Sequence, residues 1–218
     1  MKIVIIGAGG QARVVCEILK HDRNVEIVGF IDPVLKEPNE KIMGLPVLGN
    51  FPVVSELIKK GVKGFIVGVG DNKIRAQRFE EMKNLGLEPI NAIHPTANVA
   101  YDVKIGKGVV IAMGATVATN AIIGNNVIIN TGAIVEHEDV IEDNVHIAPG
   151  VALAGRVRVK KGAFLGIRSV IKEYLTIGEN AVIGAGSVVL DNIPDNAVAV
   201  GVPAKVIEIR NVEDIKNV

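Results

Sequence analysis

An aliphatic residue recurs at every sixth position through the second half of this 218-residue chain. From Ile93 to Val189, all seventeen of these positions hold Ile, Val or Leu. The residue four positions later is mostly small or aliphatic, as at Ala97, Val103 and Ala115. A strict short period is typical of a β-solenoid, in which each repeat forms one short strand with its aliphatic side chain directed inward. Three repeats close one triangular coil, so the run predicts between five and six coils of a left-handed parallel β-helix.

The composition suits a narrow interior that has no room for rings. Hydrophobic residues make up 49% of the chain, yet aromatic residues make up only 3% and there is no Trp. Each coil of a solenoid bonds only to its neighbours, so both ends of the stack need a cap. We therefore expect three parts: an α/β domain over residues 1–92, the β-helix over residues 93–203, and a C-terminal cap over residues 204–218.

The first ninety residues alternate between strand and helix patterns. Ile3–Ile6 is a β-branched run that ends at Gly7, as expected of a buried parallel strand. Alternation of this kind predicts a small Rossmann-like α/β domain with a parallel sheet. The other expected elements are strands at 26–31 and 65–69, and helices that begin after the glycine turn and cover 52–60 and 72–85.

The turn Gly7–Ala12 matches G-x-G-x-x-A, a loose dinucleotide-binding pattern. Its glycines allow the backbone to approach a phosphate at the helix N-terminus, and Asp32 follows the second strand, where a carboxylate can accept hydrogen bonds from ribose. About ninety residues cannot hold a full dinucleotide fold, so a nucleotide-linked metabolite fits better than NAD. The alternative is a tight strand–helix turn whose glycines serve only packing.

Charge, apolar run length and cysteine content argue against several classes of protein. The formal net charge is zero, which argues against a nucleic-acid partner. No apolar run reaches the roughly 18 residues of a membrane span, and the N-terminus lacks the core of a signal peptide. Cys16 is the one cysteine and permits no internal disulfide, which predicts a cytoplasmic protein.

The chain resembles a known enzyme family in several stretches. These are the GAGG turn, NAIHPTANV, IINTGAIVEHEDVIEDNVHIAPGVALAGRV, IGAGSVV and the late GVPAKVI. Together they resemble the hexapeptide-repeat sugar acyltransferases that include sialic-acid O-acetyltransferases and nucleotide-amino-sugar N-acetyltransferases. The resemblance covers essentially the whole chain. It implies a homotrimer that uses acetyl-CoA, with active sites between neighbouring β-helices and the sugar nucleotide on the α/β domain.

The same resemblance implies roles for individual residues. His137 would be the general base, and Glu138 would hydrogen-bond its imidazole. His146 would contact the thioester region of acetyl-CoA, and Gly155 would offer a backbone N–H to the thioester carbonyl. The remaining expected positions are Ile167 and Ala185 along the pantetheine, Asn130 near the base and the acceptor, and Gly9, Gly10, Gln11, Asp32 and Gly70 around the nucleotide sugar.

Three positions depart from the family pattern. Gln11 stands where many relatives carry His, Asp139 where a small inward residue is expected, and Glu142 where glycine is usual. The two acids predict either a local loosening of the coil or an additional carboxylate at the site.

The four histidines have different expected roles. His21 is expected at the solvated surface and His94 at a structural corner, whereas His137 and His146 are expected at or near outward-facing corners of the β-helix. A neutral imidazole suits a base that works near pH 7. Zinc-dependent carbonic anhydrases share this solenoid, but two of their histidines are five residues apart; His137 and His146 are nine apart, so no metal is expected.

We therefore expect an acetyl-CoA-dependent enzyme that N-acetylates a nucleotide-linked 4-amino-4,6-dideoxy sugar in surface glycan biosynthesis. O-acetylation of a sialic acid is the alternative, because the base chemistry is common to amine and hydroxyl acceptors. A non-catalytic sugar-nucleotide-binding scaffold is a further alternative. An NAD-dependent oxidoreductase would leave the solenoid unexplained.

Overall fold

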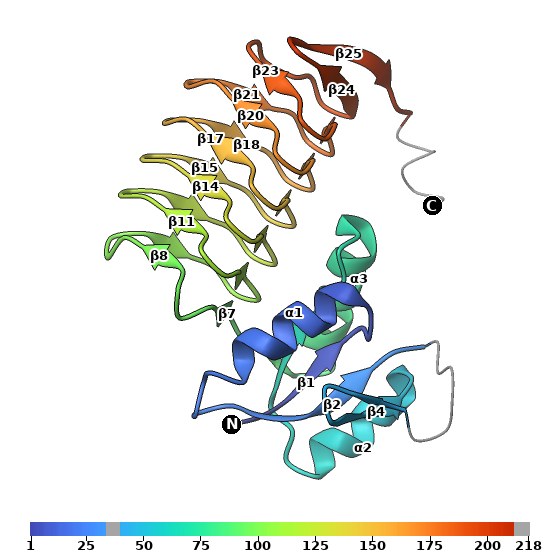
Figure 1. Ribbon diagram of the computed structural model, residues 1–218. Coiled ribbons are helices and arrows are strands. Elements are labelled where there is room, and N and C mark those ends of the chain that lie inside the picture. Colours follow the sequence, from blue (N-terminus) through green and yellow to red (C-terminus); the bar gives the residue numbers. More distant parts are fainter. Residues whose placement is uncertain (34–39, 212–218) are drawn as a thin grey trace. The chain divides into compact units, whose positions relative to one another are not determined.

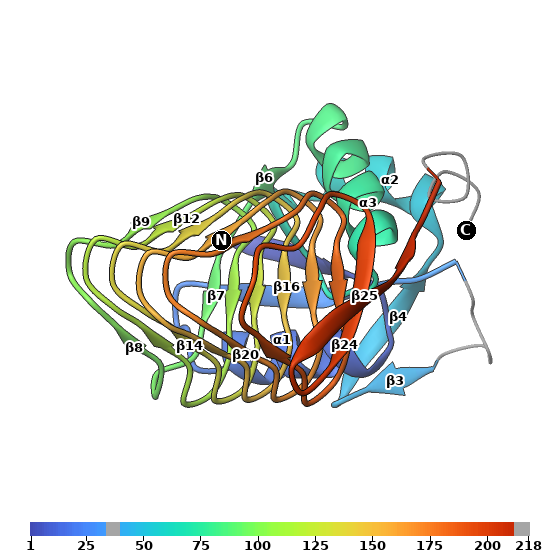
Figure 2. The same ribbon diagram turned by 90° about the horizontal axis from the view of Figure 1, so that it is seen from above.

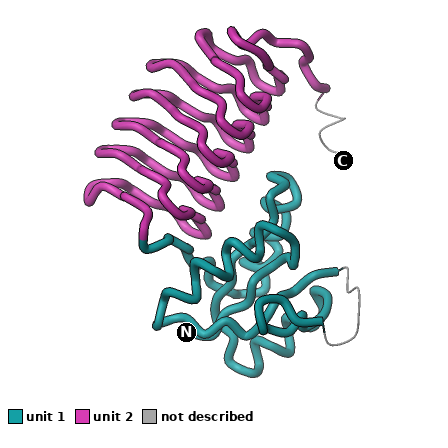
Figure 3. Tube along the Cα trace, in the orientation of Figure 1, with its two compact units in different colours: residues 1–95 teal, residues 96–218 magenta. Residues whose placement is uncertain are grey.

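The computed structural model describes residues 1–33 and 40–211. The chain divides into two compact units, Met1–Pro95 and Thr96–Val218 (Figure 3). The first unit is the α/β part and the second is the solenoid. The sequence predicts this boundary between residues 92 and 93.

The first unit contains a mostly parallel sheet with helices (Figure 1). The sheet order is β3-β4-β2-β1-β5-β6, in which β3 and β4 are antiparallel and the other pairs are parallel. Since β2 and β5 flank β1, the chain leaves β1 in opposite directions, and this switch point is where α/β sheets bind ligands. The elements are β1 Lys2–Ile6, α1 Gly10–Leu19, β2 Glu26–Ile31, β3 Lys41–Ile42, β4 Leu45–Gly49, a 3₁₀ turn Phe51–Val53, α2 Val54–Lys59, β5 Gly64–Val67, α3 Asn72–Asn84, β6 Glu88–Pro89 and β7 Ala92–Ile93.

Two glycines let α1 pack closely on this sheet. Gly7 has a φ of 102°, a left-handed conformation that glycine adopts without strain. A Cβ atom built on Gly68 would come within 2.6 Å of the Ala12 Cα, so only glycine permits this distance between β5 and α1. The G-x-G-x-x-A pattern therefore has a packing role at its first and last positions.

The second unit is a left-handed parallel β-helix, as predicted. Strands eighteen residues apart pair in register, as Val117 does with Val135 and Ile129 with Ile147. Figure 2 shows the sheets on three sides, with β9 and β12 on one side, β14 and β20 on a second, and β16 on the third. The strands are β8 Asn98–Val99, β9 Lys104–Ile105, β10 Val110–Ile111, β11 Thr116–Val117, β12 Ile122–Ile123, β13 Ile128–Ile129, β14 Ile134–Val135, β15 Val140–Ile141, β16 His146–Ile147, β17 Ala152–Leu153, β18 Arg158–Val159, β19 Phe164–Leu165, β20 Val170–Ile171, β21 Thr176–Ile177, β22 Val182–Ile183 and β23 Val188–Val189.

The repeating aliphatic residues form the interior of the prism. From Ile111 to Val189 every one of them is buried, and small residues such as Ala115, Ala121 and Ala133 fill the second inward position. The first member of the run is less covered. Ile93 is 41% exposed, and its strand β7 is the terminal strand of the sheet that continues through β10 and β13.

A second period of six governs the turns. Every sixth residue from Gly108 to Gly186 has positive φ, so each corner needs one left-handed residue. Glycine or asparagine fills most of these positions, as these residues tolerate that conformation. Four positions carry other side chains: Glu138, Arg156, Arg168 and Tyr174.

An antiparallel hairpin follows the last coil. β24 (Ala197–Gly201) pairs in parallel with β22, and β25 (Ala204–Ile209) pairs antiparallel with β24. This hairpin ends the stack where a C-terminal cap was expected. Residues 212–218 of the expected cap lie outside the described residues.

Candidate active site

The turn between β14 and β15 carries the expected base. His137 precedes Glu138, and Nδ1 of the imidazole lies 3.1 Å from Oε2 of the carboxylate. The two side chains are about half exposed, at 48% and 43%. When Nδ1 donates its proton to the carboxylate, Nε2 keeps a lone pair and can accept a proton from a substrate. The backbone of Glu138 is left-handed, with a φ of 62°, so this acid occupies a position that favours glycine or asparagine.

Gly155 lies one coil further along, directly beside the imidazole. A Cβ atom built on Gly155 would come within 2.5 Å of both Cε1 and Nε2 of His137. Within the described ranges, no carbonyl oxygen accepts a hydrogen bond from the Gly155 N–H. The corner therefore combines a proton acceptor with a backbone donor of the kind that stabilises an oxyanion.

Two residues that the sequence analysis did not identify extend this corner. The guanidinium of Arg156 donates to Glu138 Oε2 through Nε at 2.8 Å, and its terminal nitrogen donates to the Tyr174 hydroxyl. The hydrogen bonds from His137 and then Arg156 lower the pKa of Glu138, so the carboxylate stays ionised beside the base. Glu138, Arg156 and Tyr174 are eighteen residues apart in sequence, and that spacing was the signal that they share a corner.

Asp139 supports the same turn from inside the prism. Its side chain is fully buried and accepts hydrogen bonds from the N–H groups of Glu136, at 2.9 Å, and Val157, at 2.7 Å. Burial raises the pKa of Asp139 to about 7, although these two hydrogen bonds oppose the shift. The expected loosening of the coil is wrong, because the neighbouring strand β15 pairs in register on both sides.

Glu142 lies at a different corner, after β15. Its carboxylate accepts hydrogen bonds from the Arg158 guanidinium and from the Lys161 N–H. Glu142 is therefore not an additional carboxylate beside His137, and that expectation is wrong.

His146 lies next to a corner, but it is not exposed there as an outward-facing position would predict. It belongs to β16, is only 7% exposed, and packs edge-on against Phe164 with ring centroids 5.1 Å apart. The Asn130 amide nitrogen lies 3.4 Å from Nε2 of His146, and Asn130 Oδ1 accepts a hydrogen bond from the Thr131 N–H. Asn130 thus contacts His146, and strand β14 separates it from the turn of His137.

Ile167 and Ala185 are exposed on neighbouring coils of the corner that follows β19 and β22. The Gly186 N–H donates to the Ile167 carbonyl, which links the two coils at this point. Asn130 lies at the same corner, two coils before Ile167. The expected site residues therefore fall on two corners of one prism: His137, Glu138 and Gly155 on one, and Asn130, Ile167 and Ala185 on the other.

The glycine turn of the first unit lies at the carboxyl ends of the parallel strands. Gly9 caps α1 and Gly10 is its first residue. Asp32 follows β2, and its carboxylate accepts a hydrogen bond of 2.7 Å from the Ala8 N–H, so it holds the turn. The Gln11 side-chain amide nitrogen is buried and has no hydrogen-bond partner among the described residues.

Gly70 follows β5 at the same edge of the sheet. Its carbonyl accepts a hydrogen bond of 3.2 Å from the guanidinium of Arg75, which is almost fully buried. Burial lowers the pKa of Arg75 to about 9. The sequence analysis did not identify Arg75, because a charged residue inside a charged helix gives no signal of burial.

Among the described residues, no helix is both long and apolar enough to span a bilayer.

The family described as "PglD N-terminal domain" matches residues 2–82. The structure resembles that of a variant of perosamine N-acetyltransferase from Caulobacter crescentus in complex with CoA and GDP-perosamine. The TM-score is 0.91 at 36% identity, over 95% of this chain and 97% of that chain. It also resembles the acetyltransferase domain of PglB from Neisseria gonorrhoeae in complex with acetyl coenzyme A, with a TM-score of 0.88 at 32% identity, over 94% and 98% of the two chains.

Among curated proteins, the chain is 56% identical over 52 residues to dTDP-3-amino-3,6-dideoxy-alpha-D-galactopyranose 3-N-acetyltransferase of Aneurinibacillus thermoaerophilus. That alignment covers 24% of this chain and 27% of the relative. The chain thus matches only about a quarter of the length of this curated relative.

Proposed function

Because this chain belongs to the hexapeptide-repeat sugar acyltransferases that include nucleotide-amino-sugar N-acetyltransferases, we propose that it transfers an acetyl group from acetyl-CoA to the amine of a nucleotide-linked amino sugar. A 4-amino-4,6-dideoxy sugar of surface glycan biosynthesis is the proposed acceptor. The observation that carries the proposal is the corner at which His137 contacts both Glu138 and Gly155.

In the proposed reaction the sugar amine attacks the thioester carbonyl carbon. A C–N bond forms and the carbonyl electrons move to oxygen, where the Gly155 N–H stabilises the negative charge. His137 Nε2 takes the proton from the amine. The C–S bond then breaks, and the proton leaves with the CoA thiol. A general base of this kind contributes about 10²–10⁴-fold, and one oxyanion donor contributes about 10²–10³-fold.

Glu138 has a positioning role in this scheme. Its hydrogen bond to Nδ1 fixes the tautomer in which Nε2 is the acceptor, and its negative charge stabilises the imidazolium that forms. The low pKa of this carboxyl keeps it charged throughout the neutral range.

The donor is proposed to lie along the second corner. Ile167 and Ala185 offer exposed apolar surface on successive coils, which suits the pantetheine chain. His146 and Asn130 lie beside the start of this corner and are proposed to contact the thioester region. Since the base is on a different corner of the same prism, one chain does not hold both halves of the site. We therefore propose a homotrimer in which His137 faces the donor corner of a neighbouring chain.

The acceptor nucleotide is proposed to bind at the glycine turn of the first unit. Gly9 and Gly10 expose backbone N–H groups at the start of α1, where a phosphate is favoured. The buried Gln11 amide is available as a further donor, and Asp32 and Gly70 flank the turn. A cytoplasmic location belongs to the same proposal, because the one cysteine, Cys16, forms no disulfide.

The test is thiol release from acetyl-CoA with a panel of acceptors. The panel contains UDP-, GDP- and dTDP-linked 4-amino sugars, together with free and CMP-linked sialic acid. Release with one amino sugar, reduced at least about 10²-fold in His137→Ala, supports the proposal. His21→Ala is the matched control, since it removes a half-exposed histidine outside the solenoid.

Two results would contradict it. Release with sialic acid alone would make the enzyme an O-acetyltransferase. Binding of nucleotide sugars without thiol release from any acceptor would favour a scaffold and remove the role assigned to His137.

A further inference from the structure

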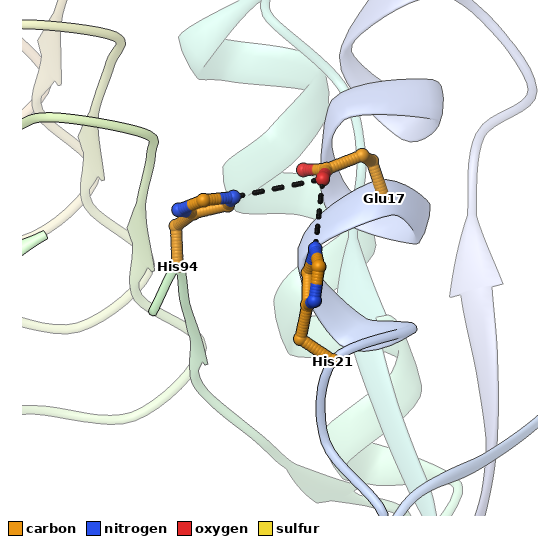
Figure 4. A group of neighbouring side chains, drawn as sticks. All are labelled: Glu17, His21 and His94. Carbon is orange, nitrogen blue, oxygen red and sulfur yellow. Dashed lines mark hydrogen bonds and ion pairs between the residues drawn. The ribbon is translucent and has the colours of Figure 1, made fainter. Parts of the chain in front are cut away.

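Three side chains that can bind metal meet at the C-terminal end of α1, whereas the glycine turn lies at its N-terminal end. Glu17 is in α1, His21 lies just after this helix, and His94 follows β7. Glu17 Oε1 lies 3.0 Å from His21 Nε2 and 3.5 Å from His94 Nε2. Figure 4 shows one nitrogen of each imidazole directed at the same carboxylate oxygen. All three residues belong to the first unit.

The spacing of these atoms is close to that of a coordination sphere. One oxygen or nitrogen from each residue lies within 4.8 Å of the others. Zinc takes imidazole nitrogen and carboxylate oxygen at about 2.0–2.2 Å, which separates tetrahedral ligands by about 3.3–3.6 Å. The two measured contacts, 3.0 and 3.5 Å, are already near this range. Small side-chain movements would complete three ligand positions.

The local structure favours this arrangement over a chance surface contact. Glu17 and His21 are four residues apart, and the His21 N–H donates to the Ile18 carbonyl, so they lie one turn apart on the same side. His94 is only 5% exposed, and its ring packs edge-on against His21 with centroids 5.3 Å apart. A buried histidine aimed at a carboxylate is thus held in place before any ion binds.

The site is also open on one side. His21 lines a surface pocket of about 240 Å³ together with Asp22 and Asn91. The Glu17 and His21 side chains are 40% and 50% exposed, so an ion can reach them from solvent and bind a water as a fourth ligand. Two imidazoles and one carboxylate are the ligand types that suit Zn²⁺ among common divalent ions.

We propose that Glu17, His21 and His94 form a site for a divalent transition metal ion, with Zn²⁺ as the best fit. The ion would connect the end of α1 to the segment after β7, two elements that already contact each other. Its role is structural and independent of acyl transfer. The spacing of His137 and His146 predicts no metal, and His21 and His94 are expected at the solvated surface and at a structural corner. This cluster instead joins two histidines far apart in the sequence to Glu17, which no local spacing indicates.

The test is a titration of the purified full-length protein, stripped of metal with a chelator, with Zn²⁺ and separately with Co²⁺. We expect one ion per chain, a visible Co²⁺ absorption spectrum with nitrogen and oxygen ligation, and a thermal midpoint raised by about 5 °C or more at saturating Zn²⁺. His21→Gln, Glu17→Gln and His94→Gln should each weaken binding by at least about 10-fold.

Asp22→Asn is the matched control, because it removes a carboxylate from the same pocket but not from the cluster. His137→Gln controls for binding at an exposed histidine elsewhere. Both should bind the ion as the wild type does. His94 is buried, so if His94→Gln fails to fold, the two other variants decide. The proposal is overturned if no ion binds, if binding survives in His21→Gln and Glu17→Gln, or if it is lost in His137→Gln.

Discussion

The Nε2 edge of His137 lies so close to Gly155 that a single methyl group on Gly155 would overlap the ring. The contact joins adjacent coils, and the Arg156 N–H donates to the His137 carbonyl at the same place. The position of the imidazole is therefore set by the coil above it as well as by its own turn.

Gly155→Ala should reduce kcat/KM by about 10²-fold or more while leaving the fold intact. The new Cβ forces the half-exposed imidazole away from its position, and a displaced base loses most of its contribution. Steady-state kinetics and thermal unfolding measure the two effects. In a His137→Ala background the same substitution should reduce kcat/KM only slightly. If the double variant instead shows the product of the two single reductions in kcat/KM, Gly155 does not act through His137.

Arg156→Gln should lower kcat several-fold and change its pH profile, with little effect on stability. The substitution removes the ion pair that holds Glu138 against His137, and exposed ion pairs contribute little to folding because water screens them. Glu138 would then be held less firmly beside His137 and would stabilise the imidazolium less well. The pH dependence of kcat checks this, with Arg13→Gln as a control for loss of an exposed arginine. An unchanged profile would exclude a positioning role for Arg156.

Arg168→Asn should stabilise the protein by about 0.5–1 kcal/mol. Arg168 has a φ of 55°, and a left-handed backbone costs an ordinary side chain about 1 kcal/mol more than it costs asparagine. Denaturant unfolding gives the difference in free energy. Arg158→Asn is the comparison, since it places the same change in strand β18 and should destabilise. A loss of stability in Arg168→Asn would mean that the side chain makes contacts worth more than the strain.

Asp139 should make the stability of the protein fall as pH rises from about 4 to 7. Below this window the carboxyl is neutral in both states. Within it, the unfolded chain loses the proton at its usual pKa of 3.8 while the folded chain keeps it up to about pH 7, so folding binds a proton. Above pH 7 the effect is constant.

Asp139→Asn removes this titration. The free energy of unfolding of the wild type, minus that of the variant, should therefore be larger at pH 5 than at pH 8. Urea unfolding at both values measures the difference. Asp102→Asn is the control, because the pKa of that half-buried acid is lowered, mainly by the hydrogen bond from the Thr119 hydroxyl. An equal difference at both pH values would mean that folding does not change the pKa of Asp139 between these two pH values.

Gln11→Ala should raise KM for the nucleotide sugar about 10-fold and leave KM for acetyl-CoA unchanged. The buried amide would lose one hydrogen bond to the ligand, worth about 1–1.5 kcal/mol. Gln77→Ala is the matched control, since Gln77 is an exposed helical glutamine that pairs with Glu81. If both KM values change together, Gln11 supports the fold of the turn instead.

The sequence predicted the two-part fold and the family because both depend on periodic or local patterns. An aliphatic residue at each sixth position can point only into a prism, and that requirement located almost every strand. Ile93 matched the period but is 41% exposed, because its strand β7 is the terminal strand of its sheet. The hairpin of β3 and β4 was missed because its strands are short and carry little alternation.

Site residues were harder to place, because their environment depends on neighbours eighteen residues away or more. Glu138 accepts a hydrogen bond from Arg156 on the next coil, and the buried Asp139 accepts one from the Val157 N–H on that coil. His146 occupies the position of an outward strand residue, yet it is buried, which the sequence alone gives no reason to expect. The residues that meet at one corner are thus spaced eighteen positions apart in the sequence and do not form a local motif.

The regular spacing of the left-handed corner residues also determines which insertions the solenoid can accept. Every coil repeats the same backbone path, and each pairs only with the coil before and after it. Eighteen residues inserted as a whole turn, far from the coils of His137, Gly155 and Tyr174, would keep every remaining side chain on its own face. An insertion of any length that is not a multiple of six would move the aliphatic residues off the interior. The solenoid can therefore grow or shrink in whole coils, and the corner of His137 and Gly155 would move along the axis unchanged.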